Sequence, residues 1–65
     1  MKLRFILARI DAAKMPADLD LPGFRLHALQ AELKGFWAVT VRANWRVIFR
    51  FDGADVVEVD YIDYH

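Results

Sequence analysis

Two histidines and an arginine are the residues of this chain that could perform acid–base and phosphate chemistry. His27 lies mid-chain, and His65 ends the chain directly after Asp63 and Tyr64. Imidazole is the side chain best suited to proton transfer near neutral pH, so two imidazoles make a general base and a general acid possible. Arg46 could place a cation beside a phosphoryl transition state. These groups meet the requirements for cleaving RNA through its own 2′-hydroxyl group, a reaction that needs no metal.

Each of these residues also has an ordinary structural interpretation. A histidine such as His27 is often a satisfied strand residue, and a C-terminal tail such as Asp63-Tyr64-His65 is often free to vary. In the functional interpretation, Asp63 orients an imidazole, and Tyr64 stacks on a base or donates a proton. Residue types alone leave the choice between these interpretations open.

The composition limits the chain to one thin domain spanning residues 1–65. A domain of this size buries only about 60% of its unfolded surface. The 57% hydrophobic content therefore favours burial shared with a partner or a second copy. Without cysteine, the chain has no disulfide framework, no Cys-based zinc site and no thiol nucleophile.

The hydropathy of the chain also bears on its location. No apolar stretch approaches ~18 residues, which excludes a membrane span. The start, Met1 to Phe5, is too short and too charged for a signal peptide. We therefore expect a reducing cytoplasm.

The net charge is zero, but the charges are segregated along the chain. The basic residues of positions 21–50 are Arg25, Lys34, Arg42, Arg46 and Arg50, whereas residues 51–65 contain acids and no lysine or arginine. Such asymmetry can mark a nucleic-acid surface, with Arg42, Arg50 and Lys34 as candidate RNA contacts. Alternatively, the basic middle and the acidic tail neutralise each other across paired strands.

Hydrophobic periodicity predicts an α+β fold. An apolar stripe with helical spacing (Leu3, Ile6, Leu7, Ile10) indicates one amphipathic helix over about residues 1–13, which Pro16 should end. From about residue 25 the period changes to two, which predicts antiparallel strands over about 25–29, 36–42, 45–52 and 56–64. We expect the helix to cover the apolar face of this sheet incompletely.

The alternation also predicts which residues of the last two strands pair. The expected pairs are Phe51 with Val57, Phe49 with Val59, Val47 with Tyr61, Arg50 with Glu58, and Ile48 with Asp60, with Arg46 near Ile62. This register requires a three-residue turn with Gly53 at positive φ. Trp37 and Trp45 fall on the apolar face, where core packing is favoured over base stacking.

The order of these segments resembles a known family. A Leu-His-x-Leu segment is followed by Gly-Phe-Trp-Ala-Val-Thr-Val-Arg-Ala-Asn-Trp-Arg-Val-Ile-Phe-Arg-Phe, a glycine turn and a terminal Asp-Tyr-His. This order resembles the HigB-type toxins of the RelE/ParE superfamily over nearly the whole chain. The resemblance implies a RelE-like fold and a ribosome-dependent, metal-independent endoribonuclease without cofactors. It also implies a helix-turn-helix, HigA-like antitoxin as partner, besides the ribosome and mRNA.

The resemblance also implies roles for individual residues. His27 matches the family's catalytic histidine, and Asp63-Tyr64-His65 matches its catalytic terminal tripeptide. Arg46 matches the arginine of the family's Asn-Trp-Arg and is expected to stabilise the scissile phosphate.

Departures from the family pattern keep a second hypothesis open. The family's His-Pro-Leu-Lys-Gly is His27-Ala28-Leu29-Gln30-Ala31 here, so a phosphate-binding lysine is replaced by Gln30. The chain also starts after the point where family members have an N-terminal strand and helix, and we expect an N-terminally shortened domain. The alternative is therefore a catalytically weak module that binds an antitoxin or forms a homodimer.

Overall fold

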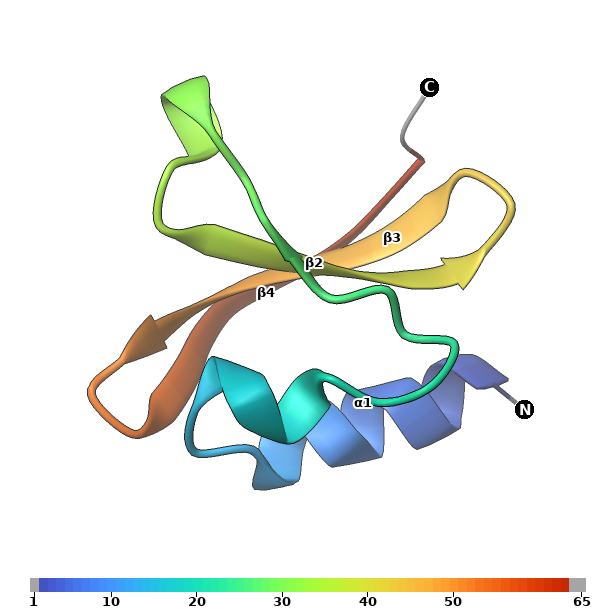
Figure 1. The fold of residues 1–65 in the computed structure, drawn as a ribbon, viewed down its shortest axis with the longest axis horizontal. Helices are drawn as coiled ribbons and strands as arrows, with labels where there is room; N and C mark the ends of the chain where they lie inside the picture. The colour runs from blue at the N-terminus through green and yellow to red at the C-terminus, as the bar shows by residue number, and fades with distance from the viewer. Residues whose placement is uncertain (1, 64–65) are drawn as a thin grey trace.

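The computed structural model describes residues 2–63, in which a helix lies across one face of a four-stranded antiparallel sheet (Figure 1). The elements in chain order are α1 (Lys2–Ala12), the 3₁₀ helix η1 (Pro16–Leu19), β1 (His27–Ala28), the 3₁₀ helix η2 (Ala31–Leu33), β2 (Phe36–Arg42), β3 (Trp45–Asp52) and β4 (Asp55–Asp63). The strands are neighbours in the order β1-β2-β3-β4. The predicted α+β fold is confirmed. Neither 3₁₀ helix was predicted.

Helix α1 forms because its apolar residues recur on one side of the helix. Ile6 and Ile10 are buried against the sheet, and the helix ends at Ala12, as expected from the proline at position 16. Leu7 belongs to the predicted stripe, yet 40% of it is exposed. The helix packs along its Ile6–Ile10 line, which leaves Leu7 at the side. No helix in residues 2–63 has the length and apolar character needed to cross a bilayer.

The main core lies between α1 and the face of the sheet that we call the helix face, marked on β3 by Val47 and Phe49. Its buried residues are Ile6, Ile10, Ala13, Leu19, Phe24, Val39, Val41, Val47 and Phe49. Trp37 and Trp45 are partly buried and pack against this cluster, so their predicted core role is confirmed. Trp45 also stacks on Tyr61, with ring centroids 4.7 Å apart.

A second, smaller cluster occupies the opposite face, which we call the arginine face because Arg46 and Arg50 of β3 belong to it. Its buried members are Leu29, Ala38 and Ile48, with Leu33, Phe36 and Ile62 packed around them. The segment that includes η2 covers this cluster, on the side of the sheet away from α1 (Figure 1). The sequence predicted one apolar face for each strand, but the centre of β3 is buried on both faces.

The register of β3 and β4 is as predicted near the C-terminal end of β4. Val47 is opposite Tyr61, Ile48 is opposite Asp60, and Arg46 is opposite Ile62. These three pairs confirm the register that the hydrophobic alternation predicted for this half of the β3–β4 pairing.

Toward the β3–β4 turn, the predicted register is wrong by one residue. Arg50 is opposite Val57 and Phe51 is opposite Val56, and the loop is the two-residue turn Gly53-Ala54. The predicted pairs of Phe51 with Val57 and of Arg50 with Glu58 are not formed, and Phe49 lies at the point where the register shifts. Gly53 does have the expected positive φ, +64°.

A β-bulge at Glu58 explains this shift. Glu58 has φ +54°, and the bulge inserts one extra residue into β4. Before the bulge the even-numbered residues of β4 point to the helix face, and after it the odd-numbered residues do. Val56 can therefore join the helix face while Val57 turns to the arginine face. Strict alternation cannot reveal such an insertion.

Strand β1 is shorter than the predicted 25–29. Arg25 has φ +52°, which breaks the extended conformation before His27. Flanking hydrogen bonds still tie this segment to β2, since the Thr40 N–H donates to the Phe24 carbonyl and the Leu29 N–H donates to the Phe36 carbonyl. The chain thus crosses from the helix face to the arginine face while staying attached to the edge of β2.

The difference in burial between Ile6 and Leu7 of α1 yields a stability prediction. Ile6→Ala should lower the free energy of unfolding by about 2–4 kcal/mol, because it leaves a cavity in a fully buried site. Leu7→Ala, one residue further along the same helix, should cost less than about 1 kcal/mol, since Leu7 is 40% exposed. Urea unfolding followed by tryptophan fluorescence measures both values. Equal losses would contradict the packing of α1 along its Ile6 line.

Candidate active site

The arginine face carries two of the predicted catalytic residues. Arg46 of β3 is opposite Thr40 of β2, and His27 of β1 is opposite Ala38, which belongs to the same face as Ile48. Because opposed residues of an antiparallel pair project to the same side, His27 and Arg46 share one face of the sheet. The helix does not cover this face.

His27 is exposed, and a local hydrogen bond orients its ring. Its Nδ1 lies 2.8 Å from the carbonyl oxygen of Arg25. A carbonyl can only accept a hydrogen bond, so the neutral ring is protonated at Nδ1. Nε2 then keeps a free lone pair, which is the arrangement a general base requires.

Arg46 is half-buried, and its own hairpin holds its guanidinium. Nη1 donates to the Ala43 carbonyl oxygen at 2.9 Å and lies 3.4 Å from the Trp45 carbonyl oxygen. Carbonyl oxygens restrict the guanidinium without neutralising its positive charge. A cation held in this way can accept a phosphate as a further partner.

The carbonyls that orient these side chains share an unusual backbone conformation. Arg25 has φ +52° and Ala43 has φ +46°, both in the left-handed region. For a residue other than glycine this conformation costs about 1 kcal/mol or more. Strain is therefore found next to both His27 and Arg46.

The two residues do not touch in this structure. His27 is in β1 and Arg46 is in β3, with β2 between them. Along the strand direction they are offset by two residues, since His27 is opposite Ala38 of β2 and Arg46 is opposite Thr40. With strands ~4.8 Å apart and ~3.4 Å per residue, their Cα atoms are separated by roughly 12 Å. This spacing leaves room for a nucleotide to lie across the face between them.

The predicted RNA-contacting residues occupy different environments. Arg50 forms an ion pair with Glu58, so cross-strand charge neutralisation operates at this position despite the shifted register. The Arg50 and Glu58 side chains are 40% and 57% exposed, and ion pairs this accessible to water contribute little stability. Arg42 at the end of β2 and Lys34 after η2 are exposed. Of the three, these two keep their charges available at the surface.

The terminal tripeptide is only partly described. Asp63 is opposite Trp45, whereas Ile62 is the residue opposite Arg46. Asp63 therefore belongs to the helix face, as Trp45 does, and it directly follows Ile62, the residue opposite Arg46. Tyr64 and His65 lie outside the described residues, and so does the predicted approach of His65 to His27.

Thr40 is a candidate site residue that sequence reasoning missed. It is the single threonine of the chain, it lies directly opposite Arg46, and it belongs to the arginine face. Its hydroxyl group can donate to a phosphate oxygen or accept from a 2′-hydroxyl. The alternation of the β2–β3 hairpin places Thr40 on the same face as Arg46, and this alternation was the sequence signal that could have identified it. Within residues 2–63, no group of three or more His, Cys, Asp or Glu is placed to hold a metal ion.

One helix on a four-stranded antiparallel meander, with a histidine and an arginine on the face that the helix does not cover, is the architecture of a RelE-like domain. The family model described as "RelE-like toxin of type II toxin-antitoxin system HigB" matches residues 1–65. The chain belongs to this family of HigB-like toxins.

A curated relative supports this assignment. Endoribonuclease HigB of Proteus vulgaris is 41% identical to this chain over 59 residues, which make up 91% of this chain and 64% of the relative. The match therefore spans less than two thirds of that protein's length.

The carbonyl contact of His27 predicts a specific tautomer. In the His65→Ala variant, which retains a single histidine, the neutral His27 ring should carry its proton on Nδ1, because that atom donates to the Arg25 carbonyl. Nitrogen chemical shifts of the ring at high pH measure this directly. A neutral ring protonated at Nε2 would contradict the contact.

Proposed function

We propose that this chain is an endoribonuclease toxin of a type II toxin–antitoxin module that cleaves translated mRNA on the ribosome. One observation carries the proposal: His27, with a free Nε2, and Arg46, with a carbonyl-held guanidinium, share the face of a HigB-type fold that α1 does not cover. The name of the Proteus vulgaris relative, an endoribonuclease, supports the same activity.

The proposed reaction uses the RNA's own 2′-hydroxyl group as nucleophile. A base removes the 2′-hydroxyl proton, and the 2′ oxygen attacks the adjacent phosphorus. The bond to the 5′ oxygen breaks, and that oxygen takes a proton from an acid. The products are a 2′,3′-cyclic phosphate and a 5′-hydroxyl, so the reaction balances without a metal or a cofactor.

The residues divide these tasks among them. His27 and His65 share the roles of base and acid, and Arg46 stabilises the charge that develops on the phosphate. Asp63 orients an imidazole, and Tyr64 contacts the nucleotide. Arg42 and Lys34 contact the RNA backbone as exposed cations, and Arg50 does so in exchange for its ion pair with Glu58.

The partners in this proposal are the ribosome with its mRNA and a helix-turn-helix, HigA-like antitoxin. Membership of a type II toxin–antitoxin family supports an antitoxin partner. Because the substrate is translated mRNA, the protein would act in the cytoplasm.

A second candidate function is a weakly catalytic module whose main task is to bind an antitoxin or a second copy of itself. The placement of His27 and Arg46 in different cross-strand rows favours it, since His27 shares the row of Ala38 and Ile48 whereas Arg46 shares the row of Thr40. Gln30, exposed where the family has a lysine, also removes a phosphate contact.

Removing the proposed catalytic groups tests the first function. His27→Ala, His65→Ala and Arg46→Ala should each slow the cleavage of ribosome-bound mRNA by about 100-fold or more, because each removes a proton-transfer group or the phosphate cation. Single-turnover cleavage of a labelled mRNA measures the rate. The control is Arg9→Ala, which removes an exposed cation from α1 and should leave the rate unchanged.

The corresponding result in cells is growth arrest on expression, relieved by His65→Ala. Normal growth and no cleavage of ribosome-bound mRNA, from a chain that is folded and intact, would reject the nuclease and favour the binding module.

The use of the 2′-hydroxyl group can be tested on the substrate. An mRNA with a single 2′-deoxynucleotide at the cleavage site should not be cut there, because the attacking oxygen is missing. Mapping the cleavage products with and without ribosomes measures this and the ribosome requirement together. Cleavage of the 2′-deoxy position, or equal cleavage of free mRNA, would contradict the corresponding part of the proposal.

A further inference from the structure

Arg25 is an exposed cation next to the candidate site, and none of the roles in the proposed reaction uses it. Its neighbours Phe24 and Leu26 pack into the core under α1, which anchors this segment to the sheet. Because both neighbours point to the helix face and Arg25 is exposed, its side chain points away from that face. No carboxylate between residues 2 and 63 forms an ion pair with it. Arg25 therefore adds an available positive charge to the arginine face.

Backbone contacts place Arg25 in the same cross-strand row as Thr40 and Arg46. The Thr40 N–H donates to the Phe24 carbonyl oxygen at 2.7 Å, which brings the backbone of Phe24 and Arg25 against Thr40. On its other side, Thr40 is opposite Arg46. With strands ~4.8 Å apart, the Cα atoms of Arg25 and Arg46 are separated by roughly 10 Å. The Thr40 hydroxyl group thus lies between two guanidinium groups.

The spacing of the two cations suits two phosphates of one strand. Nη1 of Arg46 donates to the Ala43 carbonyl oxygen of its own hairpin at 2.9 Å, which holds this guanidinium and prevents it from leaning across Thr40 toward Arg25. A guanidinium binds a phosphate through N–H groups that must lie within hydrogen-bond distance of its oxygens. Two cations kept apart in this way contact successive phosphates of an RNA strand that crosses the row.

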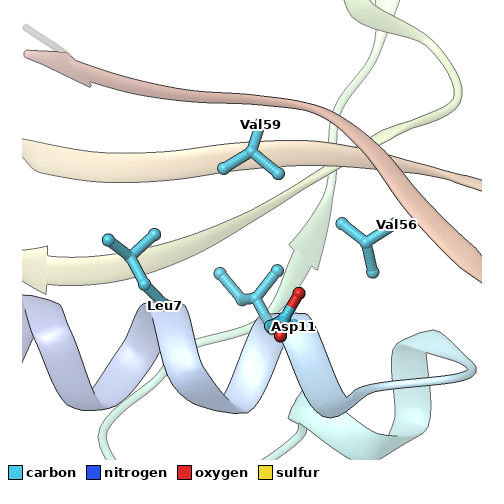
Figure 2. Close-up of a pocket in the computed structure, with 5 residues that line it drawn as sticks. Leu7, Asp11, Val56 and Val59 are labelled. Carbon is cyan, nitrogen blue, oxygen red and sulfur yellow. The ribbon is translucent and has the colours of Figure 1, made fainter.

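The pocket on the helix face is unsuited to an anion. Leu7, Ile10, Val56 and Val59 line a volume of about 220 Å³ together with Asp11. Figure 2 shows the Asp11 carboxylate among these apolar side chains. A phosphate there would lose hydration without gaining a cation, and it would be repelled by the carboxylate. The charges of the two faces therefore direct an RNA strand to the arginine face.

The backbone of Arg25 also orients the proposed base. Nδ1 of His27 lies 2.8 Å from the Arg25 carbonyl oxygen, and Arg25 has φ +52°. A phosphate bound by the guanidinium of Arg25 would hold the same residue whose carbonyl aims the imidazole. Binding of the strand and alignment of the base are therefore linked through one residue.

We propose that Arg25 binds the phosphate next to the scissile one, with the Thr40 hydroxyl group contacting the strand between the two phosphates. The inference rests on the proposed function, because Arg46 takes the scissile phosphate. It adds a requirement on the substrate, which must continue past the scissile bond to a second charged phosphate. Such a contact sets the position of the strand on the protein and carries no sequence information.

Binding of RNA to the full chain tests the contact without cleavage. The probe is a short single-stranded RNA with 2′-O-methyl groups throughout, which cannot be cut. Each phosphate contact with a single strand adds about 0.7 to the slope of log affinity against log salt concentration. Arg25→Gln should lower the slope by about this amount, and Arg25→Lys should keep it. The control Arg9→Gln removes an exposed cation from α1 and should leave the slope unchanged. Amide shifts of isotope-labelled protein measure the binding, even when it is weak.

A matched pair of substrates tests the contact during cleavage. In one mRNA, an uncharged methylphosphonate replaces the phosphate on the 5′ side of the scissile one, and in another it replaces the phosphate on the 3′ side. One of the two should be cut about tenfold more slowly by the unmodified chain. Arg25→Gln should slow cleavage of the ordinary mRNA by the same factor. It should slow cleavage of the sensitive methylphosphonate mRNA no further, because the two changes remove the same contact.

Three results would overturn the inference. The first is an unchanged salt slope in Arg25→Gln, and the second is an equal loss in Arg9→Gln. The third is a loss of cleavage that is the same for the ordinary and both methylphosphonate mRNAs. If Arg25→Gln does not fold, Arg25→Gly removes the same charge and also relieves the positive φ.

The outcome separates this inference from the proposed function. A chain that binds RNA through Arg25 but does not cleave ribosome-bound mRNA keeps the phosphate contact and rejects the nuclease. A chain in which Arg25→Gln binds and cleaves as the unmodified protein does keeps the nuclease and rejects the phosphate contact.

Discussion

Burial of three successive residues, Val47, Ile48 and Phe49, is the constraint on which this structure depends. Successive side chains of a strand point to opposite faces, so β3 must be covered on both sides. Helix α1 covers Val47 and Phe49, and the segment from Leu29 to Leu33 covers Ile48. The chain must therefore pass from one face of the sheet to the other between these elements. That crossing brings His27 to the edge of the face that carries Arg46.

Backbone carbonyls then complete the local geometry. The Arg25 carbonyl orients His27 and the Ala43 carbonyl holds Arg46, and both carbonyls belong to residues in the left-handed conformation. The core therefore decides which face each side chain joins, while strained turns decide how each side chain is aimed. Strain of this kind persists only where the surrounding packing imposes it. Here the buried rows of β2 and β3 between the two turns provide that packing.

The predictable parts of the fold were those governed by periodicity. Ile6 and Ile10 on one helical stripe, and the alternation through Trp45 to Phe51, were sufficient for the helix, the strands and the placing of Arg46 opposite Ile62. The bulge at Glu58 was not predictable, because a glutamate at positive φ leaves no mark in the hydrophobic pattern. Ile48 was assigned to a polar face, since its burial depends on residues 29–33 folding back over it. Thr40 was missed because its relation to Arg46 is a matter of pairing between strands.

The order of the strands has a consequence for how this chain acquires its structure during synthesis. Each strand pairs with the next one along the chain, so the sheet can grow by successive hairpins, and short-range pairing favours rapid folding. Helix α1 is made before the strands, and its partners Val47 and Phe49 are made much later. A helix of 11 residues is barely stable alone in water. The α1 segment therefore stays unfolded until β3 emerges, and α1 then docks as one of the last steps.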